Sequence, residues 1–439
     1  MKLQNVIHIL VGILCIGLFP NAQALSPAPD GGYPGGNTAE GQNALFSLTS
    51  GGYNTAVGYL SLRSDATASF NTAIGAGTLL ANTADENTAT GAAALLSNST
   101  GTKNTANGAF ALFSNTTGNL NTANGDTALF SNTEGFRNTA TGAGALFSNT
   151  TGTFNTANGF QALVNNTTGS ANTVNGDQAL FNNTTGSDNA GIGNAALANN
   201  STGDHNAAIG YFALVTNTTG RINTAVGADA LPFNTTGMNN IALGASAGFN
   251  VTTADNVICI GADGQNVSNS CYIGEIFGVT SAGGTAVFIN STGKLGTQTS
   301  SARFKEEIKV MDKASEALFA LNPVTFYYKK AIDPVRTSQF GLVAEEVEKV
   351  NPDLVVHDKD GKPYSVRYDA VNAMLLNEFL KEHRTVQELK STLAQQQKDY
   401  QTTATRQQKQ IEALTAGLQK VSDQLELSEP APRTVVSSH

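Results

Sequence analysis

Two residues in the last third of the chain, Ser300 and Lys305, are of types that together can cut a peptide bond. A serine hydroxyl attacks a carbonyl carbon only when a base takes its proton, and a neutral lysine amine can serve as that base. Burial beside another cation lowers the pKa of an amine, and Arg303 stands close to Lys305 in the sequence. The pair is therefore a candidate catalytic dyad. The alternatives are Ser301 as the nucleophile, or solvated linker residues without a catalytic role.

The spacing of this pair does not by itself produce a contact. Five residues span about 17 Å in an extended chain, and on an α-helix they lie roughly 140° apart around the axis. Another part of the fold must therefore bring the two side chains together. We expect the assembly of three chains to supply this geometry, so that cleavage would follow correct folding.

Other residues that often do chemistry are widely scattered. A glycosidase needs two carboxylates on one cleft, whereas Asp126 and Asp177 share a repeat phase but lie 51 positions apart. His205, His357 and His383 are too dispersed to form a metal site. The sequence therefore predicts no metal, no cofactor and no enzyme in the repeat region.

The three cysteines allow one disulfide. Cys15 falls in the apolar leader described below, which leaves Cys259 and Cys271. An oxidising compartment would permit a disulfide between these two residues, closing a loop in a region with little core of its own. Two free buried thiols are the alternative, and the sequence leaves both open.

Few charges and many glycines set the chain apart from an ordinary enzyme domain, since 13% of its 439 residues are charged and 45 are Gly. Residues 25–299 carry 14 acidic and 5 basic groups, and residues 300–439 carry 20 and 19. Binding to a nucleic acid or an anionic membrane requires clustered Lys and Arg. The composition therefore argues against both as partners.

The first 24 residues have the pattern of a secretory signal. Lys2 precedes an apolar run over residues 6–19, and the small-residue site Ala22-Gln23-Ala24 follows. A membrane anchor is the alternative, but this run is too short to span a bilayer comfortably. A lipoprotein site at Cys15 would need a small residue in place of Leu14. We expect cleavage after Ala24 and a secreted or cell-surface protein without a stable membrane span.

A repeat of 17 residues, with one step of 16, dominates the next part of the chain. Its consensus is N-T-A-x-G-x-x-A-L-x-x-N-T-T-G-x-x. Short β-compatible stretches, T-A-x-G and A-L-F, alternate with Asn and Gly, which accept left-handed turns at low cost. Repeats begin at Asn37, Asn54, Asn71, Asn87, Asn104, Asn121, Asn138, Asn155, Asn172, Asn189, Asn206, Asn223 and Asn240.

This period predicts a β-solenoid. Stacked coils align equivalent residues, so that Ala and Leu form interior stripes and Asn or Thr form hydrogen-bonded ladders. The interior side chains are small, and the phenylalanines in phase after the Leu have no obvious burial site. We infer that three chains share the core. The phenylalanines in question are Phe113, Phe130, Phe147 and Phe181.

The repeats resemble the head repeats of trimeric autotransporter adhesins, which are parallel β-rolls of short S/N-x-A-x-G units. The period differs, and the outer-membrane barrel that ends those adhesins is missing. The resemblance implies a homotrimeric adhesive or structural fibre with a surface glycan or a host or cell-surface molecule as its ligand. The alternative is a carbohydrate-active, glycan-binding or ice-binding spike whose site forms between chains. The N-x-T triplets would be glycosylation acceptors in a eukaryotic secreted protein, but as periodic turn residues they need no such role, and the turn explanation is favoured.

Several motifs after residue 299 resemble the endosialidase-type C-terminal intramolecular chaperone, an autocleaving serine-peptidase domain. They include S-S-A-R-F-K-E-E-I from Ser300, L-N-P-V-T-F-Y from Leu321 and F-G-L-V-A-E-E-V from Phe340. The resemblance covers residues 300–395 and implies a Ser300–Lys305 dyad that cuts between Thr299 and Ser300. Some members carry a histidine before the Gly-apolar-Ala motif, where this chain has Ser338-Gln339. An uncleaved trimerisation cap is the alternative.

The remaining C-terminal pattern is helical. Ile411, Leu414, Leu418, Val421 and Leu425 recur at 3-4-3-4 spacing, which predicts a short trimeric coiled coil, with an exposed amphipathic helix as the alternative. We therefore predict a mainly β solenoid followed by an α+β chaperone domain. The predicted segments are a signal peptide (1–24), a linker (25–36), the solenoid (37–255), a β stem (256–299), the chaperone domain (300–385), the coiled coil (386–428) and a disordered tail (429–439).

Overall fold

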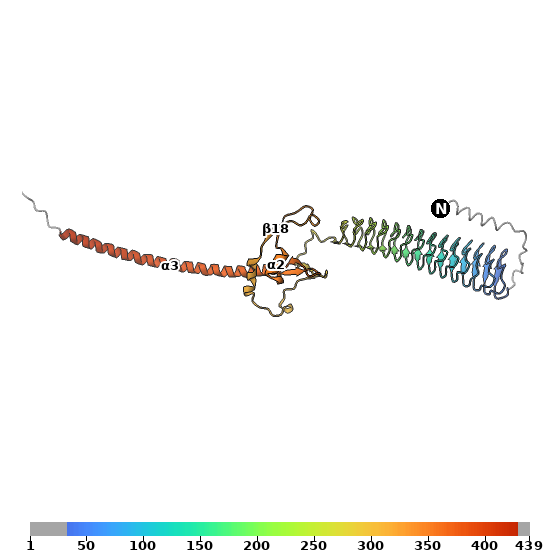
Figure 1. Cartoon of the computed structure of the whole chain (residues 1–439), viewed down its shortest axis with the longest axis horizontal. Coiled ribbons are helices and arrows are strands. Elements are labelled where there is room, and N and C mark those ends of the chain that lie inside the picture. The colour runs from blue at the N-terminus through green and yellow to red at the C-terminus, as the bar shows by residue number, and fades with distance from the viewer. Residues whose placement is uncertain (1–32, 429–439) are drawn as a thin grey trace, which may run out of the picture. The chain divides into compact units, whose positions relative to one another are not determined.

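The computed structural model describes residues 33–428, so the predicted signal peptide and the tail lie outside the described residues. Contacts divide the chain between Thr280 and Ser281 into two compact units. This boundary falls inside the predicted stem. The units are drawn in Figure 1, and each is described by itself.

The first unit is a parallel β-solenoid whose fifteen strands pair in sequence order. Equivalent residues of successive coils are 17 positions apart, as in Thr105↔Thr122. The step between β3 and β4 is 16, and the last step is 13. The strands are β1 (Thr38–Glu40), β2 (Thr55–Val57), β3 (Thr72–Ile74), β4 (Thr88–Thr90), β5 (Thr105–Asn107), β6 (Thr122–Asn124), β7 (Thr139–Thr141), β8 (Thr156–Asn158), β9 (Thr173–Asn175), β10 (Ala190–Ile192), β11 (Ala207–Ile209), β12 (Thr224–Val226), β13 (Ile241–Leu243), β14 (Val257–Ile260) and β15 (Ser270–Ile273).

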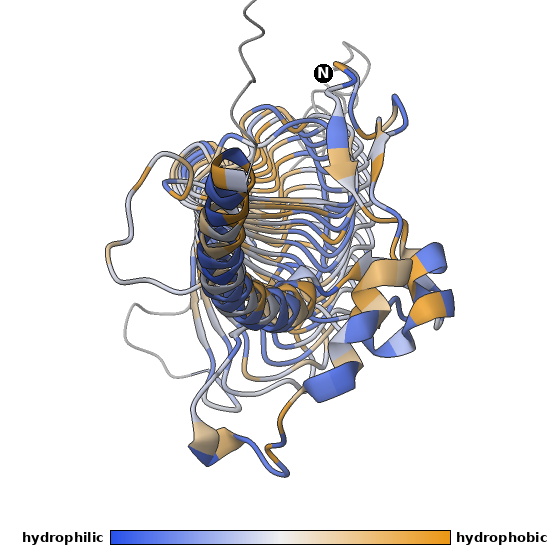
Figure 2. Cartoon of the chain, turned by 90° about the vertical axis from the view of Figure 1, so that its left-hand side faces the viewer, coloured by the Kyte–Doolittle hydropathy of each residue, from blue (hydrophilic) through white to orange (hydrophobic). Residues whose placement is uncertain are grey.

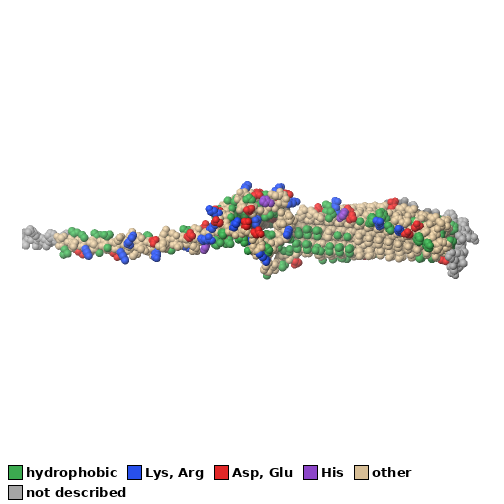
Figure 3. Space-filling view, turned by 90° about the horizontal axis from the view of Figure 1, so that it is seen from below, with side chains coloured by type: hydrophobic (Ala, Val, Ile, Leu, Met, Phe, Trp, Pro, Cys, Tyr) green, Lys and Arg blue, Asp and Glu red, His purple; other side chains and the backbone are tan. Residues whose placement is uncertain are grey.

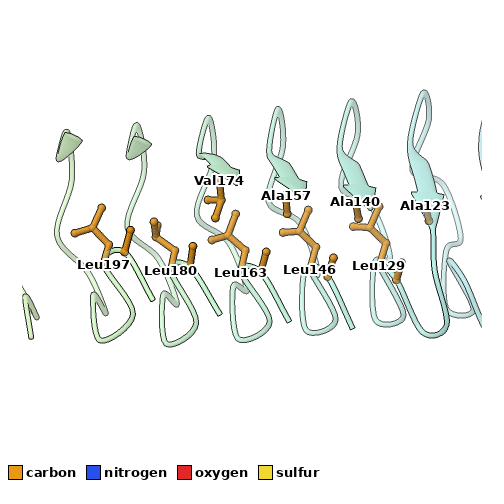
Figure 4. Packing of buried hydrophobic residues seen from close by; sticks show 14 of the residues in the cluster. Ala123, Leu129, Ala140, Leu146, Ala157, Leu163, Val174, Leu180 and Leu197 are labelled. Atoms are coloured by element: carbon orange, nitrogen blue, oxygen red, sulfur yellow. The ribbon is translucent and has the colours of Figure 1, made fainter. Parts of the chain in front are cut away.

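The solenoid core consists of Ala and Leu stripes from one chain. Alternation along a strand points the middle residue of T-A-x inward, and Ala123 and Ala140 are fully buried. Leu129 and Leu146 pack against these alanines in successive layers (Figure 4). One chain therefore closes its own core. The inference that three chains share the solenoid core is corrected by this packing.

The A-L-F stretch forms a turn, and not a second strand as its composition suggested. Leu112 has a φ of 51°, in the left-handed region. Its amide donates to the carbonyl of Ala128 in the next coil, at 2.9 Å. The bond between coils offsets the cost of this backbone conformation, which a non-glycine residue rarely adopts alone. The leucine side chain reaches the core from this turn.

Buried asparagines connect the coils in ladders. Asn132 Nδ2 donates to Asn115 Oδ1 at 2.8 Å and to the Gly135 carbonyl at 2.9 Å. The same pattern repeats from coil to coil, and each of these asparagines is fully buried. Asn115 and Asn149 begin N-x-T triplets, so their burial leaves no room for a glycan. In these two triplets the buried Asn has a structural role.

The phenylalanines after the Leu also form a ladder within one chain. Phe113 stacks on Phe130, and Phe130 on Phe147, with 5.0 Å between ring centroids in each pair. The rings are half-buried. Stacking along the axis therefore provides the packing that the sequence analysis assigned to neighbouring chains.

The second unit combines short hairpins, 3-10 helices and one long helix. Its small core contains Val347, Leu354, Val355, Val366 and Met374. Antiparallel pairs join β16 to β17, β18 to β19, and β20 to β21. The elements are β16 (Val287–Ile289), β17 (Leu295–Thr297), η1 (Ala302–Phe304), η2 (Asp312–Ala320), β18 (Val324–Phe326), β19 (Gln339–Gly341), α2 (Ala344–Val350), η3 (Pro352–Leu354), β20 (Val355–His357), β21 (Pro363–Val366) and α3 (Tyr368–Ser428).

Helix α3 runs without interruption for 61 residues. Its surface is mostly hydrophilic (Figure 2). The residues of the predicted seam are exposed in one chain, including Leu414 and Leu418. Each helix of a coiled coil must present such an apolar 3-4-3-4 seam to its partners. The coiled coil itself stays a prediction. Within residues 33–428, no helix combines the length and hydrophobicity needed to cross a membrane.

Candidate functional site

A short turn brings Lys305 back to Ser300. Residues 302–304 form the 3-10 helix η1, in which the Phe304 amide donates to the Ser301 carbonyl and the Lys305 amide to the Ala302 carbonyl, both at 3.1 Å. The turn shortens the path between the two side chains, and Lys305 Nζ donates to Ser300 Oγ at 3.5 Å. The expectation that assembly must supply this contact is therefore wrong. Local backbone geometry within one chain is sufficient.

This pair lies on the surface. Both Ser300 and Lys305 are exposed. The guanidinium of Arg303 lies 4.6 Å from the ring centroid of Phe304, so this cation is stacked on an aromatic face. Because an amine becomes a better base when water is removed from it, the single chain provides the contact but not the dehydration.

The segment before the candidate cleavage bond lies next to the start of α3. The Gln298 side chain hydrogen-bonds to the carboxylate of Asp369 and holds the pKa of that carboxyl below its usual range. Asp369 lies in the first turn of α3. Both residues line a groove of about 700 Å³ between the β16–β17 hairpin and β21. The residue two positions before Ser300 therefore lies beside a carboxylate of α3.

A second serine–lysine cluster lies between η2 and α3, and the sequence analysis missed it. Ser315 is fully buried and donates to Glu378. Asn377 Nδ2 donates to Ser315 Oγ at 2.7 Å, and Lys381 Nζ donates to Glu378 Oε1 at 2.7 Å. The Lys381 ammonium and the Ser315 hydroxyl lower the pKa of Glu378. The only sequence signal was the Asn377–Glu378–Lys381 spacing on one helical face.

This cluster is suited to holding two elements together and not to attacking a substrate. Lys381 Nζ also donates to the Asp312 carbonyl of η2, at 2.7 Å. The Ser315 hydroxyl is enclosed and used in hydrogen bonds, so no substrate carbonyl can reach it. The cluster fixes η2 on the first part of α3, which is the helix that also anchors Gln298.

The two cysteines do not form the disulfide that the sequence allowed. Both thiols are free; Cys259 is buried and Cys271 is exposed. In the parallel register Cys259 pairs with Tyr272, and Cys271 pairs with Ile258. Neighbouring positions on a strand point to opposite faces, so one thiol faces the core and the other faces outward. Burial raises the pKa of the Cys259 thiol, and nearby Cys271 raises it further.

The remaining candidates stay apart. Asp126 and Asp177 are separated by three coils, or roughly 14 Å along a sheet with 4.8 Å strand spacing, and Asp177 accepts from Asn194 at 3.2 Å. This separation exceeds that of a glycosidase pair. Among the described residues, no three His, Cys, Asp or Glu side chains gather as metal ligands would.

A comparison with known protein families matches part of the C-terminal unit. Residues 300–356 match a peptidase family model described as chaperone of endosialidase. The match begins at Ser300 and confirms the resemblance in this part of the chain. The protein is thus a β-solenoid with an endosialidase-type chaperone domain. Membership of this family implies a folding chaperone of the autocleaving serine-peptidase type, and it implies trimeric assembly. No curated protein and no solved structure matches the chain.

Proposed function

We propose that the C-terminal domain assembles three chains, directs folding of the solenoid, and then releases itself by cutting between Thr299 and Ser300. The observation that carries this proposal is the 3.5 Å contact between Lys305 Nζ and Ser300 Oγ, directly after the bond to be cut. The match of the domain to an autocleaving chaperone family supports it independently.

The cut begins when Ser300 Oγ attacks the carbonyl carbon of Thr299. Lys305 takes the hydroxyl proton and passes it to the Ser300 nitrogen as the C–N bond breaks. The ester left between Thr299 and Ser300 is then hydrolysed by water. The products are a carboxylate at Thr299 and a fragment that begins with Ser300.

Assembly controls this reaction by dehydrating the base. In one chain the Lys305 side chain is exposed to water. A neighbouring chain that covers this surface would favour the neutral amine. Cleavage would then require correct assembly, although the contact itself does not.

The processed solenoid is a secreted or cell-surface fibre with an adhesive or structural role. The leader pattern of residues 1–24 supports secretion. Cleavage would separate the solenoid from the chaperone domain. A denatured solenoid would then have to refold without that domain. The fibre would be stable for kinetic reasons.

The test is denaturing-gel and intact-mass analysis of the wild type, Ser300→Ala and Lys305→Ala. We expect a wild-type fragment beginning at Ser300 that is absent in both variants. Ser301→Ala tests the alternative nucleophile, and Lys309→Ala is a matched control because Lys309 is exposed and pairs with Glu307 at 3.2 Å. Both controls should cleave normally. Wild type that stays intact after native folding would contradict autoproteolysis and leave a permanent trimerisation cap.

A further inference from the structure

The outer face of the solenoid sheet changes character along the chain. The third strand position carries Thr90, Asn107, Asn124, Thr141, Asn158 and Asn175 in β4–β9. In β10–β15 the same register position carries an aliphatic row, defined as Ile192, Ile209, Val226, Leu243, Ile260 and Ile273. Figure 3 shows rows of hydrophobic side chains on the C-terminal half of the solenoid, while the middle coils are mainly polar.

Solvent reaches this aliphatic row. Ile192, Ile209, Leu243, Ile260 and Ile273 are each between 40% and 50% exposed. A shorter row at the first strand position, Ile241, Ile258 and Cys271, widens the apolar surface. Neither row contains a charged residue, which is the composition of a protein interface core. A contiguous apolar face of this kind is unusual on a surface that stays in water.

The coil fold itself does not require these aliphatic residues. Coils with Asn or Thr at the third position keep the same parallel register and the same buried Ala, as Asn107↔Asn124 shows. The row therefore serves something outside the single chain. Val57 and Ile74 are also aliphatic at this register position in β2 and β3. The unbroken row, however, occupies the last six strands, and Ile273 lies 27 positions before Ser300. This position near the C-terminal domain indicates the partner.

We propose that the aliphatic row is the contact between solenoids, and that its occupant is the same row of a second and third copy of this chain. This inference rests on the proposed function, in which the C-terminal domain joins three chains. Chains joined near residue 300 run parallel with equal coils level, so identical rows face a common axis. The short connection keeps their effective concentration high. The polar middle coils have no such surface.

Cys271 provides a direct probe, since it lies on this face while Cys259 is buried. The experiment uses the full chain with Cys15→Ser and Ser300→Ala, a short bis-maleimide as cross-linker, and sedimentation analysis for molar mass. The row variant combines Ile209→Asn, Leu243→Asn and Ile260→Asn, which introduces the residue that the middle coils carry. The control variant combines Phe113→Asn, Phe130→Asn and Phe147→Asn on the other apolar ladder. A position control moves the thiol from the sheet face to Thr236, an exposed residue of an N-T-T-G turn, by Cys271→Ser with Thr236→Cys.

We expect a trimer in which Cys271 cross-links to its copies. The row variant should lose at least tenfold in cross-linking yield with an unchanged circular dichroism spectrum, while the phenylalanine variant keeps the yield and the Thr236→Cys chain gives little product. A trimer whose Cys271 fails to cross-link, or whose row variant cross-links as well as wild type, overturns this inference and leaves the proposed function standing. A monomeric chain would contradict the proposed assembly, and the inference with it.

Discussion

Asp65 fills, in the second coil, the buried position that Asn82 fills in the third. Both side chains are fully buried. The Asp65 carboxylate accepts from the Ala68 amide at 2.9 Å and from Asn71 Nδ2 at 3.4 Å. Burial raises the pKa of Asp65 from 3.8 to about 6, and nearby Asp85 adds to the effect, while these two hydrogen bonds oppose it. One member of the buried polar ladder is therefore a titrating acid.

Asp65→Asn should stabilise the solenoid at neutral pH. Because the folded-state pKa lies above the unfolded-state pKa, the folded chain binds the proton more tightly than the unfolded chain. The stability gained from this proton is complete below about pH 3.8 and is lost as the pH rises through about 6. We expect the variant to gain about 1–3 kcal/mol at pH 7 and to lose the pH dependence between pH 4 and 7. Thermal melts at several pH values measure this. Asp126→Asn, at an exposed carboxyl, is the control. A variant less stable than wild type at pH 7 would refute the argument.

Asn132→Ala should strongly destabilise the middle coils. It removes the buried Oδ1 that accepts from the Asn149 side chain, and the buried Nδ2 that donates to Asn115 Oδ1 and to the Gly135 carbonyl. Leaving such groups unsatisfied costs about 1–3 kcal/mol each. We expect a loss of roughly 2–4 kcal/mol in urea unfolding.

The matched control for this substitution is Asn107→Ala. Asn107 is exposed and donates only to Asn124, at 3.3 Å. Its replacement should change stability by less than about 0.5 kcal/mol. Equal losses in the two variants would mean that the buried ladder contributes no more than a surface amide.

Lys305→Arg separates charge from basicity at the candidate dyad. Arginine keeps the positive charge and can donate to Ser300, but it cannot take up a proton from the hydroxyl. We expect cleavage to slow at least about a hundredfold, the lower end of what a general base contributes, while the molar mass of the assembly stays unchanged. Lys309→Arg should cleave at the wild-type rate. If Lys305→Arg also cleaved normally, Lys305 would act only as a hydrogen-bond donor.

Asp369 should act as a positioning residue through Gln298. Asp369→Ala removes the anchor of the segment before the cleavage bond, whereas Asp369→Asn retains a hydrogen-bonding side chain. We expect about a tenfold slower cleavage for the first variant and a smaller change for the second, because misplacement of reacting groups is costly. Quenched time points on a denaturing gel give the rates. A residue with a merely structural role would slow cleavage only by lowering the melting temperature, which is measured in parallel.

Acid should loosen the contact between η2 and α3. The Lys381 ammonium, together with the Ser315 hydroxyl, lowers the pKa of Glu378 from 4.5. Because the folded-state pKa is lower than the unfolded-state pKa, the ionised carboxylate stabilises the folded state at pH values above about 4.5. This contribution is lost as the pH falls from about 4.5 through the folded-state pKa. Hydrogen exchange of residues 312–320 should therefore speed up in acid beyond its intrinsic rate. In Glu378→Gln this extra acid dependence should disappear; its persistence would point to another group.

The sequence predicted the solenoid because its signals are local and repeated. The T-A-x strands and the interior position of Ala111 and Leu112 follow from the period. The left-handed turn at Leu112 could not be predicted, because its cost is offset only by a bond to the next coil. The Ser300–Lys305 contact depends on one 3-10 turn, whose backbone angles the residue types do not specify. The Ser315–Glu378 contact joins residues 63 positions apart, beyond the reach of any local pattern.

The asparagine ladder has one direction along the solenoid. In each of its nine links, from Asn98→Asn82 to Asn234→Asn217, the amide donates toward the earlier coil. Dipoles aligned head to tail reinforce one another. Backbone amides such as that of Leu112 donate in the opposite sense, toward the later coil, so the two sets of dipoles oppose each other. The side-chain ladder therefore distinguishes the two ends of the solenoid chemically: every link has its donor on the C-terminal side and its acceptor on the N-terminal side.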